Sequence, residues 1–239
     1  MFWSRWCFFT GFCFGTTTIE FLGTTSSIQN DLTITCFDAG HAELARVYWQ
    51  HTGEGVSSRL AEACLNNSQS PAAAEAKQTL RRRIAVLANA QPDHVFLFST
   101  GMAAIYTIHR ALRQVYPDRR AAQFGFPYVD TLKVLEKFGP GAAFFPQGTD
   151  ADLDILSTTV NTEPLSGIFT EVPSNPLLTS PKLMRLAAMC RYQNIPLIVD
   201  DTIATWVNTD VLHLADITCA SLTKAFSGVG DVAGGVAIL

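Results

Sequence analysis

The 239-residue sequence lacks several patterns that would each assign it to a class of protein. Its six cysteines include no Cys-x-x-Cys pair and its five histidines form no cluster, so we expect no bound metal. Charged residues make up only 16% and the formal net charge is −4, which argues against a nucleic-acid partner. No apolar run reaches the roughly 20 residues that a membrane-spanning helix needs. Scattered cysteines in a chain of this length favour free thiols in a reducing compartment, and we therefore expect a cytoplasmic location.

The first part of the chain shows little regular patterning. Residues 1–40 have no helix or strand period and are predicted to be an irregular segment. The apolar run 2–14 has three interpretations: a packing arm, a weak targeting segment without a clear cleavage site, or a mispredicted start of the coding sequence. The third is favoured, because the Gly- and Thr-rich residues that follow have no period either. Residues 41–93 predict an N-terminal arm with helices over 42–50, 56–65 and 71–88.

Residues 94–239 alternate short apolar runs with segments of helical period, which predicts an α/β fold with a mainly parallel sheet. Each polar cluster follows an apolar run, and open α/β sheets bind ligands at these carboxyl ends of their strands. A proline at position 181 suits the first turn of one helix, and Thr149 or Asp150 suits the N-cap of another. The expected strands are 94–98, 122–126, 142–145, 167–170, 195–199 and 217–220, and the expected helices are 102–115, 129–138, one after residue 149, and 181–192.

Lys224 has the setting that most strongly indicates chemistry. A lone lysine is ordinarily a solvated surface residue. This one follows an apolar strand and two hydroxyl residues, Ser221 and Thr223, which are suited to binding a phosphate. A lysine that is partly shielded from water loses some of its proton affinity, as a nucleophile that forms a Schiff base requires.

Two other strand ends carry polar residues that have an ordinary and a chemical interpretation. Asp200 and Asp201 are each suited to capping the next turn. Because successive side chains along a strand point to opposite faces, only one of the two can point toward a ligand at the strand end, and we expect it to be Asp200. An ionised carboxylate there would keep a pyridine nitrogen protonated. Ser99 precedes either an ordinary capped helix or one whose free amides, at Gly101 and Met102, bind a phosphate.

Tyr128 and Asn175 are ambiguous in the same way. An aromatic residue after a strand is ordinarily part of a core, but a tyrosine can also stack on a planar ring and transfer a proton. Asn175, in the run Pro173-Ser174-Asn175-Pro176, is either a turn residue or a hydrogen-bond donor to a ring oxygen. The order of all these residues along one α/β frame is more specific than any one of them.

In that order the motifs resemble those of the Cys/Met-metabolism enzymes that depend on pyridoxal phosphate (PLP). The resemblance covers residues 94–239 well and 40–90 loosely. It implies the large PLP-binding domain of fold type I, the aspartate-aminotransferase-like fold. The motifs are Ser99-Thr100-Gly101-Met102-Ala103-Ala104, Tyr128, Glu171-Val172-Pro173-Ser174-Asn175-Pro176, Val199-Asp200-Asp201-Thr202, Ser221-Leu222-Thr223-Lys224 with Gly228, and Asp231-Val232-Ala233-Gly234-Gly235.

The resemblance also implies a role for each site residue. Lys224 would form the Schiff base and move protons, Asp200 would pair with the pyridine nitrogen, and Tyr128 would stack on the ring and assist proton transfer. Asn175 would contact the ring oxygen. The substrate would be a small amino acid, and the enzyme would be a homo-oligomer, a dimer or tetramer. The residues implied to hold the phosphate are Gly101, Met102, Ser221 and Thr223.

The run from Tyr48 to Arg59 resembles the fungal cystathionine γ-synthase branch of the family. The implied reaction is γ-replacement in transsulfuration and methionine biosynthesis, in which an activated homoserine ester and cysteine give cystathionine. A cystathionine or methionine γ-lyase and a homoserine-ester sulfhydrylase share the same motifs and stay open as alternatives. The sequence stops at Leu239, soon after the lysine, so the family's small C-terminal domain is expected to be missing. An inactive fragment is therefore a third alternative.

Overall fold

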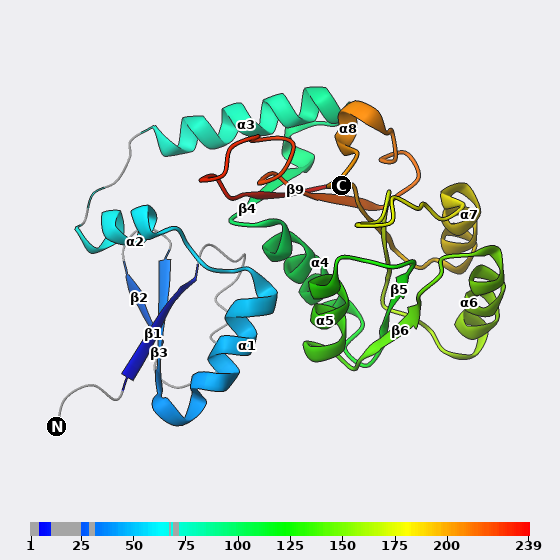
Figure 1. Cartoon of the computed structure of the whole chain (residues 1–239), viewed down its shortest axis with the longest axis horizontal. Helices are drawn as coiled ribbons and strands as arrows, with labels where there is room; N and C mark the ends of the chain where they lie inside the picture. Colours follow the sequence, from blue (N-terminus) through cyan, green and yellow to red (C-terminus); the bar gives the residue numbers. More distant parts are fainter. Residues whose placement is uncertain (1–4, 11–24, 29–31, 67, 69–71) are drawn as a thin grey trace.

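The computed structural model describes residues 5–10, 25–28, 32–66, 68 and 72–239 (Figure 1). Its main sheet has seven strands. Five neighbouring strands run parallel to one another: β9, β8, β7, β5 and β6. Strand β10 is antiparallel to both of its neighbours. The α/β class and the mainly parallel sheet are therefore confirmed. The strands in spatial order are β4 (Val95–Phe98), β10 (Gly235–Ile238), β9 (Ile217–Ser221), β8 (Leu197–Asp200), β7 (Ile168–Glu171), β5 (Ala121–Phe124) and β6 (Ala142–Phe145).

Helices connect these strands and cover both faces of the sheet. They are α4 (Gly101–Val115), α5 (Val129–Lys137), α6 (Asp150–Thr162), α7 (Leu183–Gln193) and the short α8 (Thr205–Asn208). Figure 1 shows α6 and α7 on one side of β5 and β6, with α4 and α5 on the other. Thr149 caps α6 by accepting the Asp152 amide, one of the two caps expected there. Helix α7 begins after Lys182, whose backbone is not helical, so the prediction that Pro181 lies in its first turn was wrong.

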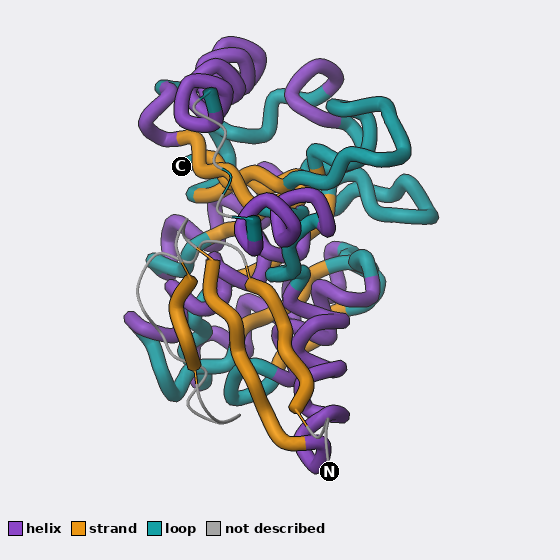
Figure 2. Tube along the Cα trace, turned by 90° about the vertical axis from the view of Figure 1, so that its left-hand side faces the viewer, coloured by secondary structure: helices purple, strands orange, loops and turns teal. Residues whose placement is uncertain are grey.

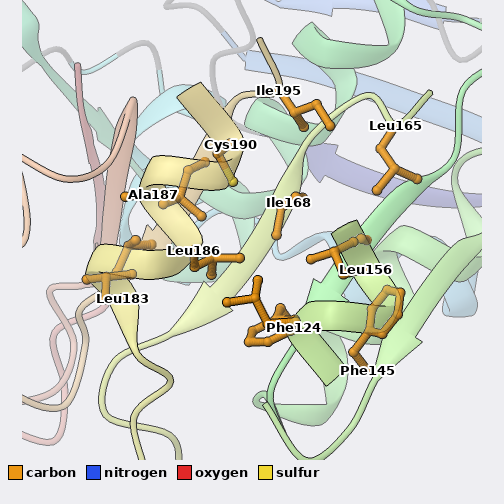
Figure 3. Packing of buried hydrophobic residues seen from close by; sticks show 14 of the residues in the cluster. Phe124, Phe145, Leu156, Leu165, Ile168, Leu183, Leu186, Ala187, Cys190 and Ile195 are labelled. Carbon is orange, nitrogen blue, oxygen red and sulfur yellow. The ribbon is translucent and has the colours of Figure 1, made fainter. Parts of the chain in front are cut away.

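The core lies against both faces because the central strands carry apolar residues at successive positions, as buried parallel strands do. Figure 3 shows Leu156 from α6 and Leu186 from α7 packed around Ile168 of β7, and all three side chains are fully buried. On the other face, Ile105 of α4 packs in a cluster with Phe169 of β7. Because apolar residues pack against both faces of the sheet, the carboxyl ends of the strands are fixed in position relative to one another.

Strand β10 was not predicted from the sequence. It is only four residues long and follows a glycine-containing turn, so it has too little pattern to be recognised, yet it lies between β4 and β9. This position requires glycine at its first residue, because a Cβ on Gly235 would lie 1.9 Å from the carbonyl oxygen of Thr100. A Cβ on Gly101 would likewise lie 2.7 Å from the Cβ of Ser221. These two close approaches press the start of α4 against β9 and β10.

The N-terminal region contains the helices α1 (Ala42–Thr52), α2 (Ser58–Leu65) and α3 (Ala73–Ala88), close to the three expected, with short 3-10 helices at Ala39–His41 and Pro92–His94. The expectation of an irregular segment over 1–40 is corrected, since β1 (Arg5–Thr10), β2 (Thr25–Ile28) and β3 (Leu32–Asp38) form an antiparallel sheet in the order β1-β3-β2. Figure 2 shows these strands side by side. Their Thr, Ile and aromatic residues favour strands without strict alternation.

Residues 1–4 and 11–24 lie outside the described residues, as do 29–31, so most of the apolar run 2–14 and the three interpretations of it are not tested. No helix in the described part of the chain is long and apolar enough to cross a membrane. The division into residues 1–40, 41–93 and 94–239 remains our proposal for the organisation of the chain.

Replacing Gly235 by alanine is expected to lower the free energy of unfolding by roughly 3 kcal/mol, because the new methyl group would overlap backbone that is fixed at the start of α4. Gly230 is a matched control, since a Cβ there meets nothing within 4 Å, and Gly230→Ala should change stability by no more than about 0.5 kcal/mol. Urea denaturation followed by circular dichroism measures both. Equal stability of the two variants would show that the close approach at Gly235 is not a real constraint.

Candidate active site

One cavity of about 430 Å3 lies at the carboxyl ends of β7, β8 and β9, beside the first turn of α4. The structure brings all of the sequence-predicted site residues into its lining: Gly101, Met102, Tyr128, Asn175, Asp200, Ser221, Thr223 and Lys224. Thr100, Ile105, Glu171, Thr202 and Ile203 complete the lining. The residues converge because five different strands, β4, β5, β7, β8 and β9, end at the same edge of the sheet.

Asp200 closes β8, and its carboxylate is held by the residues that follow it. The backbone N–H of Thr202 donates to Asp200 Oδ1 at 3.0 Å, and the Thr202 hydroxyl donates to the same oxygen at 2.6 Å. The Thr202 hydroxyl in turn accepts the backbone N–H of Ser221 at 2.8 Å, which ties β8 to β9. Burial raises the pKa of Asp200, although both hydrogen bonds from Thr202 act to lower it. The carboxylate is therefore fixed in orientation but costly to keep ionised.

Asp201 faces away from this cavity, as strand alternation requires. Its side chain is fully buried, accepts the Thr209 hydroxyl at 2.8 Å, and leaves Oδ2 without a hydrogen-bond partner among the described residues. Burial raises the pKa of Asp201 to about 7. Asp200 is thus the acid of the pair that a ligand in the cavity can reach.

The start of α4 provides a place for an anion. Thr100 is the N-cap and accepts the backbone N–H of Ala103 at 3.0 Å. The Thr100 hydroxyl also donates to the carbonyl oxygen of Gly53 at 2.9 Å, which ties the end of α1 to this turn. The amides of Gly101 and Met102 precede the helix's own hydrogen bonds and lie at the positive end of its dipole. They are therefore suited to a phosphate group.

Lys224 lies in the turn that follows β9 and lines the same cavity. Lys224 is exposed, and its position in a turn beyond the end of β9 accounts for this. Its partial shielding from water stays a prediction. The hydroxyl of Thr223 accepts the N–H of Gly234 at 3.1 Å and so helps to hold the loop between them.

Glu171 is one of the cavity-lining residues that the sequence did not single out, although it stands in one of the family motifs. It ends β7 directly opposite Asp200, which ends β8. Only 6% of its surface is exposed, and it accepts the backbone N–H of Tyr128 at 2.7 Å. The nearby backbone N–H of Asn175 also acts to lower its pKa. Burial and the neighbouring Asp200 carboxylate raise the pKa of Glu171 to about 7. The sequence could have indicated Glu171 through its place at the end of a predicted strand, as it did for Asp200.

Comparison with known proteins places this constellation in a family. Residues 67–239 match the family model described as Cys/Met metabolism PLP-dependent enzyme. The chain belongs to this family. The solved structure of CalE6, a methionine gamma lyase from Micromonospora echinospora, has a TM-score of 0.56 and 26% identity over 65% of this chain and 41% of that one. The type I fold that the resemblance implied is therefore confirmed.

Two fungal relatives show which branch of the family is similar. Cystathionine gamma-synthase-like enzyme iboG2 of Amanita muscaria is 35% identical over 90% of this chain and 47% of its own length. Cystathionine gamma-synthase of Neurospora crassa is 45% identical over 64% of this chain and 26% of its own length. The chain thus spans less than half of these relatives.

The cofactor of the family is PLP, and the cavity fits it. Its volume of about 430 Å3 is in the range of small-molecule sites. The cavity offers a primary amine at Lys224, a carboxylate at Asp200 and a helix N-terminus at Gly101, which suit the aldehyde, the pyridine nitrogen and the phosphate of that molecule. Within the described ranges, no group of three or more His, Cys, Asp or Glu side chains is arranged to hold a metal ion.

The buried Asp201 makes a pH-dependent contribution to stability that can be isolated by mutation. Its pKa rises from an ordinary 3.8 to about 7 on folding, so its contribution is fully present below pH 3.8 and is lost as pH rises through about 7. Asp201→Asn cannot ionise. The free energy of unfolding of D201N relative to the wild type should therefore increase by roughly 2 kcal/mol or more between acidic and mildly alkaline pH. Denaturation curves across this range test it, and a constant difference would contradict it.

Proposed function

We propose that this chain forms the PLP-binding part of an enzyme that catalyses γ-replacement, joining an activated homoserine ester and cysteine to give cystathionine. The observation that carries the proposal is the presence of Lys224, Asp200 and the α4 N-terminus in the lining of one cavity. The choice of reaction is supported by the names of the fungal relatives. We also propose a small amino-acid substrate and a homo-oligomeric enzyme, as in the family that the sequence resembles.

At one end of the cavity, the amides of Gly101 and Met102 would hold the phosphate of PLP. The helix dipole favours a dianion there, and glycine at position 101 permits close approach. Ser221 and Thr223 line the cavity beside this turn and would add hydroxyl contacts. Thr223 is already bonded to Gly234, so its second role would be to fix the loop that closes this end.

At the other end, Asp200 would hold a proton on the pyridine nitrogen. Bound PLP supplies an electron sink for the charge that develops on the substrate's α carbon. The carboxylate can stabilise that sink because Thr202 fixes its orientation. Tyr128 would cover the ring, and the Asn175 amide would contact the ring oxygen.

Lys224 and Tyr128 would carry the proton transfers. The amine of Lys224, once displaced by the substrate amine, would take the proton from the α carbon and handle the one at the β carbon. Burial and the nearby Asp130 raise the pKa of Tyr128, so its hydroxyl stays protonated at neutral pH and would act as a donor. Cysteine thiolate would then add at the γ carbon after the ester group has left.

A second candidate function is cofactor binding without turnover. It is favoured by the exposure of Lys224 to water, because a catalytic amine works best when it is shielded. A γ-lyase reaction is the third, and the structural similarity to CalE6 supports it. The three candidates share the PLP site and differ only in the fate of the substrate once PLP is bound.

Mixing the protein with PLP is expected to produce the visible absorbance band of PLP joined to an amine, and Lys224→Ala should abolish it. Lys182, whose side chain pairs with Asp150 away from the cavity, provides the control, and Lys182→Ala should retain the band. A band that persists in K224A would contradict the assignment of Lys224.

Products formed from an activated homoserine ester distinguish the candidate reactions. A γ-replacement enzyme should convert the ester to cystathionine only when cysteine is added, whereas a γ-lyase should release α-ketobutyrate. Both products are measured on the same PLP-loaded sample. A sample that binds PLP but forms neither product would contradict γ-replacement by this chain and support the binding role.

A further inference from the structure

Glu171 connects two chain segments that line the cavity. Tyr128 is the residue before α5, and Asn175 lies in the loop after β7. Both line the cavity, and the backbone N–H of Tyr128 donates to the Glu171 carboxylate at 2.7 Å. The backbone N–H of Asn175 lies near the same carboxylate and acts to lower its pKa. The positions of these two residues therefore depend on a single buried side chain.

The charge of this side chain depends on its neighbours. Asp200 on β8 lies beside Glu171, and Cys219 on β9 lies beside Asp200. The other titratable groups that line its cavities are Tyr128, at the start of α5, and Lys224, after β9. Helix α4 contributes only Gly101, Met102 and Ile105, which do not titrate. Burial, and after it repulsion from Asp200, raises the pKa of Glu171 to about 7.

We propose that Glu171 is a positioning residue that orients Tyr128 and Asn175 around the cofactor ring. The charge of the ring nitrogen next to Asp200 controls how strongly Glu171 holds the two backbone N–H groups. The inference rests on the proposed PLP site. A protonated ring nitrogen next to Asp200 would cancel the repulsion that Glu171 feels. Glu171 would then lose its proton, and a carboxylate holds an N–H more strongly than a neutral carboxyl group does. Cofactor binding would thereby strengthen the hold of Glu171 on the backbone of Tyr128 and Asn175.

Two substitutions separate this role from a general effect of buried charge. Glu171→Gln keeps the shape but cannot ionise. Asp201→Asn makes the same chemical change at another acid near Asp200, whose side chain bonds to Thr209 instead. Glu171→Asp keeps the charge and shortens the reach, so it should restore part of what E171Q loses.

The first measurement uses the protein without cofactor. In 15N spectra, the amide protons of Tyr128 and Asn175 should shift with pH, with a midpoint near 7, because the carboxylate that accepts them ionises there. The shift should persist in D201N, reappear with a changed midpoint in E171D, and be absent from E171Q. Amide signals that titrate equally in E171Q and the wild type would overturn the proposal.

The second measurement adds PLP itself. The midpoint for both amides should fall on binding, and protons should be released near neutral pH, as detected by the dependence of the binding heat on the buffer. E171Q should release fewer protons, bind PLP roughly tenfold more weakly and show weaker circular dichroism from the bound ring. Unchanged proton release and dichroism in E171Q would overturn the coupling. Absence of PLP binding by the wild type would overturn the proposed function and the coupling, while the first measurement still decides the contact of Glu171 with the two amides.

Discussion

The cost of burying the Asp200 carboxylate is the constraint on which the site depends. A carboxylate removed from water is stable only when hydrogen bonds or a positive charge compensate the loss. Thr202 supplies two hydrogen bonds, and Ser221 fixes Thr202 in turn. The effect of Asp200 extends to Glu171, one strand away, whose pKa it helps to raise. The remaining compensation would come from a ligand that brings a positive charge to the cavity, as a protonated pyridine ring does.

The fold makes this arrangement possible because parallel strands end at one edge of the sheet. Residues that lie far apart in the sequence, such as Tyr128 and Lys224, thereby meet in one cavity. Close backbone contacts at Gly101 and Gly235 hold the α4 N-terminus against that edge. The N-terminus of α4 is consequently held at this edge by contacts of the main chain rather than by flexible side chains.

Much of this could be predicted from the sequence, because apolar periodicity is a local signal and the site residues follow it at strand ends. The Thr149 cap and the inward direction of Asp200 are of this kind. Strand β10 was missed because its pairing is nonlocal, and Glu171 because its neighbour, Asp200, is close only across the sheet. The exposure of Lys224 was also beyond the sequence, since shielding depends on what packs over the turn.

The most direct test of the central claim is to treat the PLP-loaded protein with borohydride, which reduces a Schiff base to a stable bond, and to map the labelled peptide by mass spectrometry. The account predicts that the cofactor's mass is found on Lys224 alone. A label on another lysine, or a protein that takes up no label while it is folded, would contradict the assignment of this cavity as the PLP site.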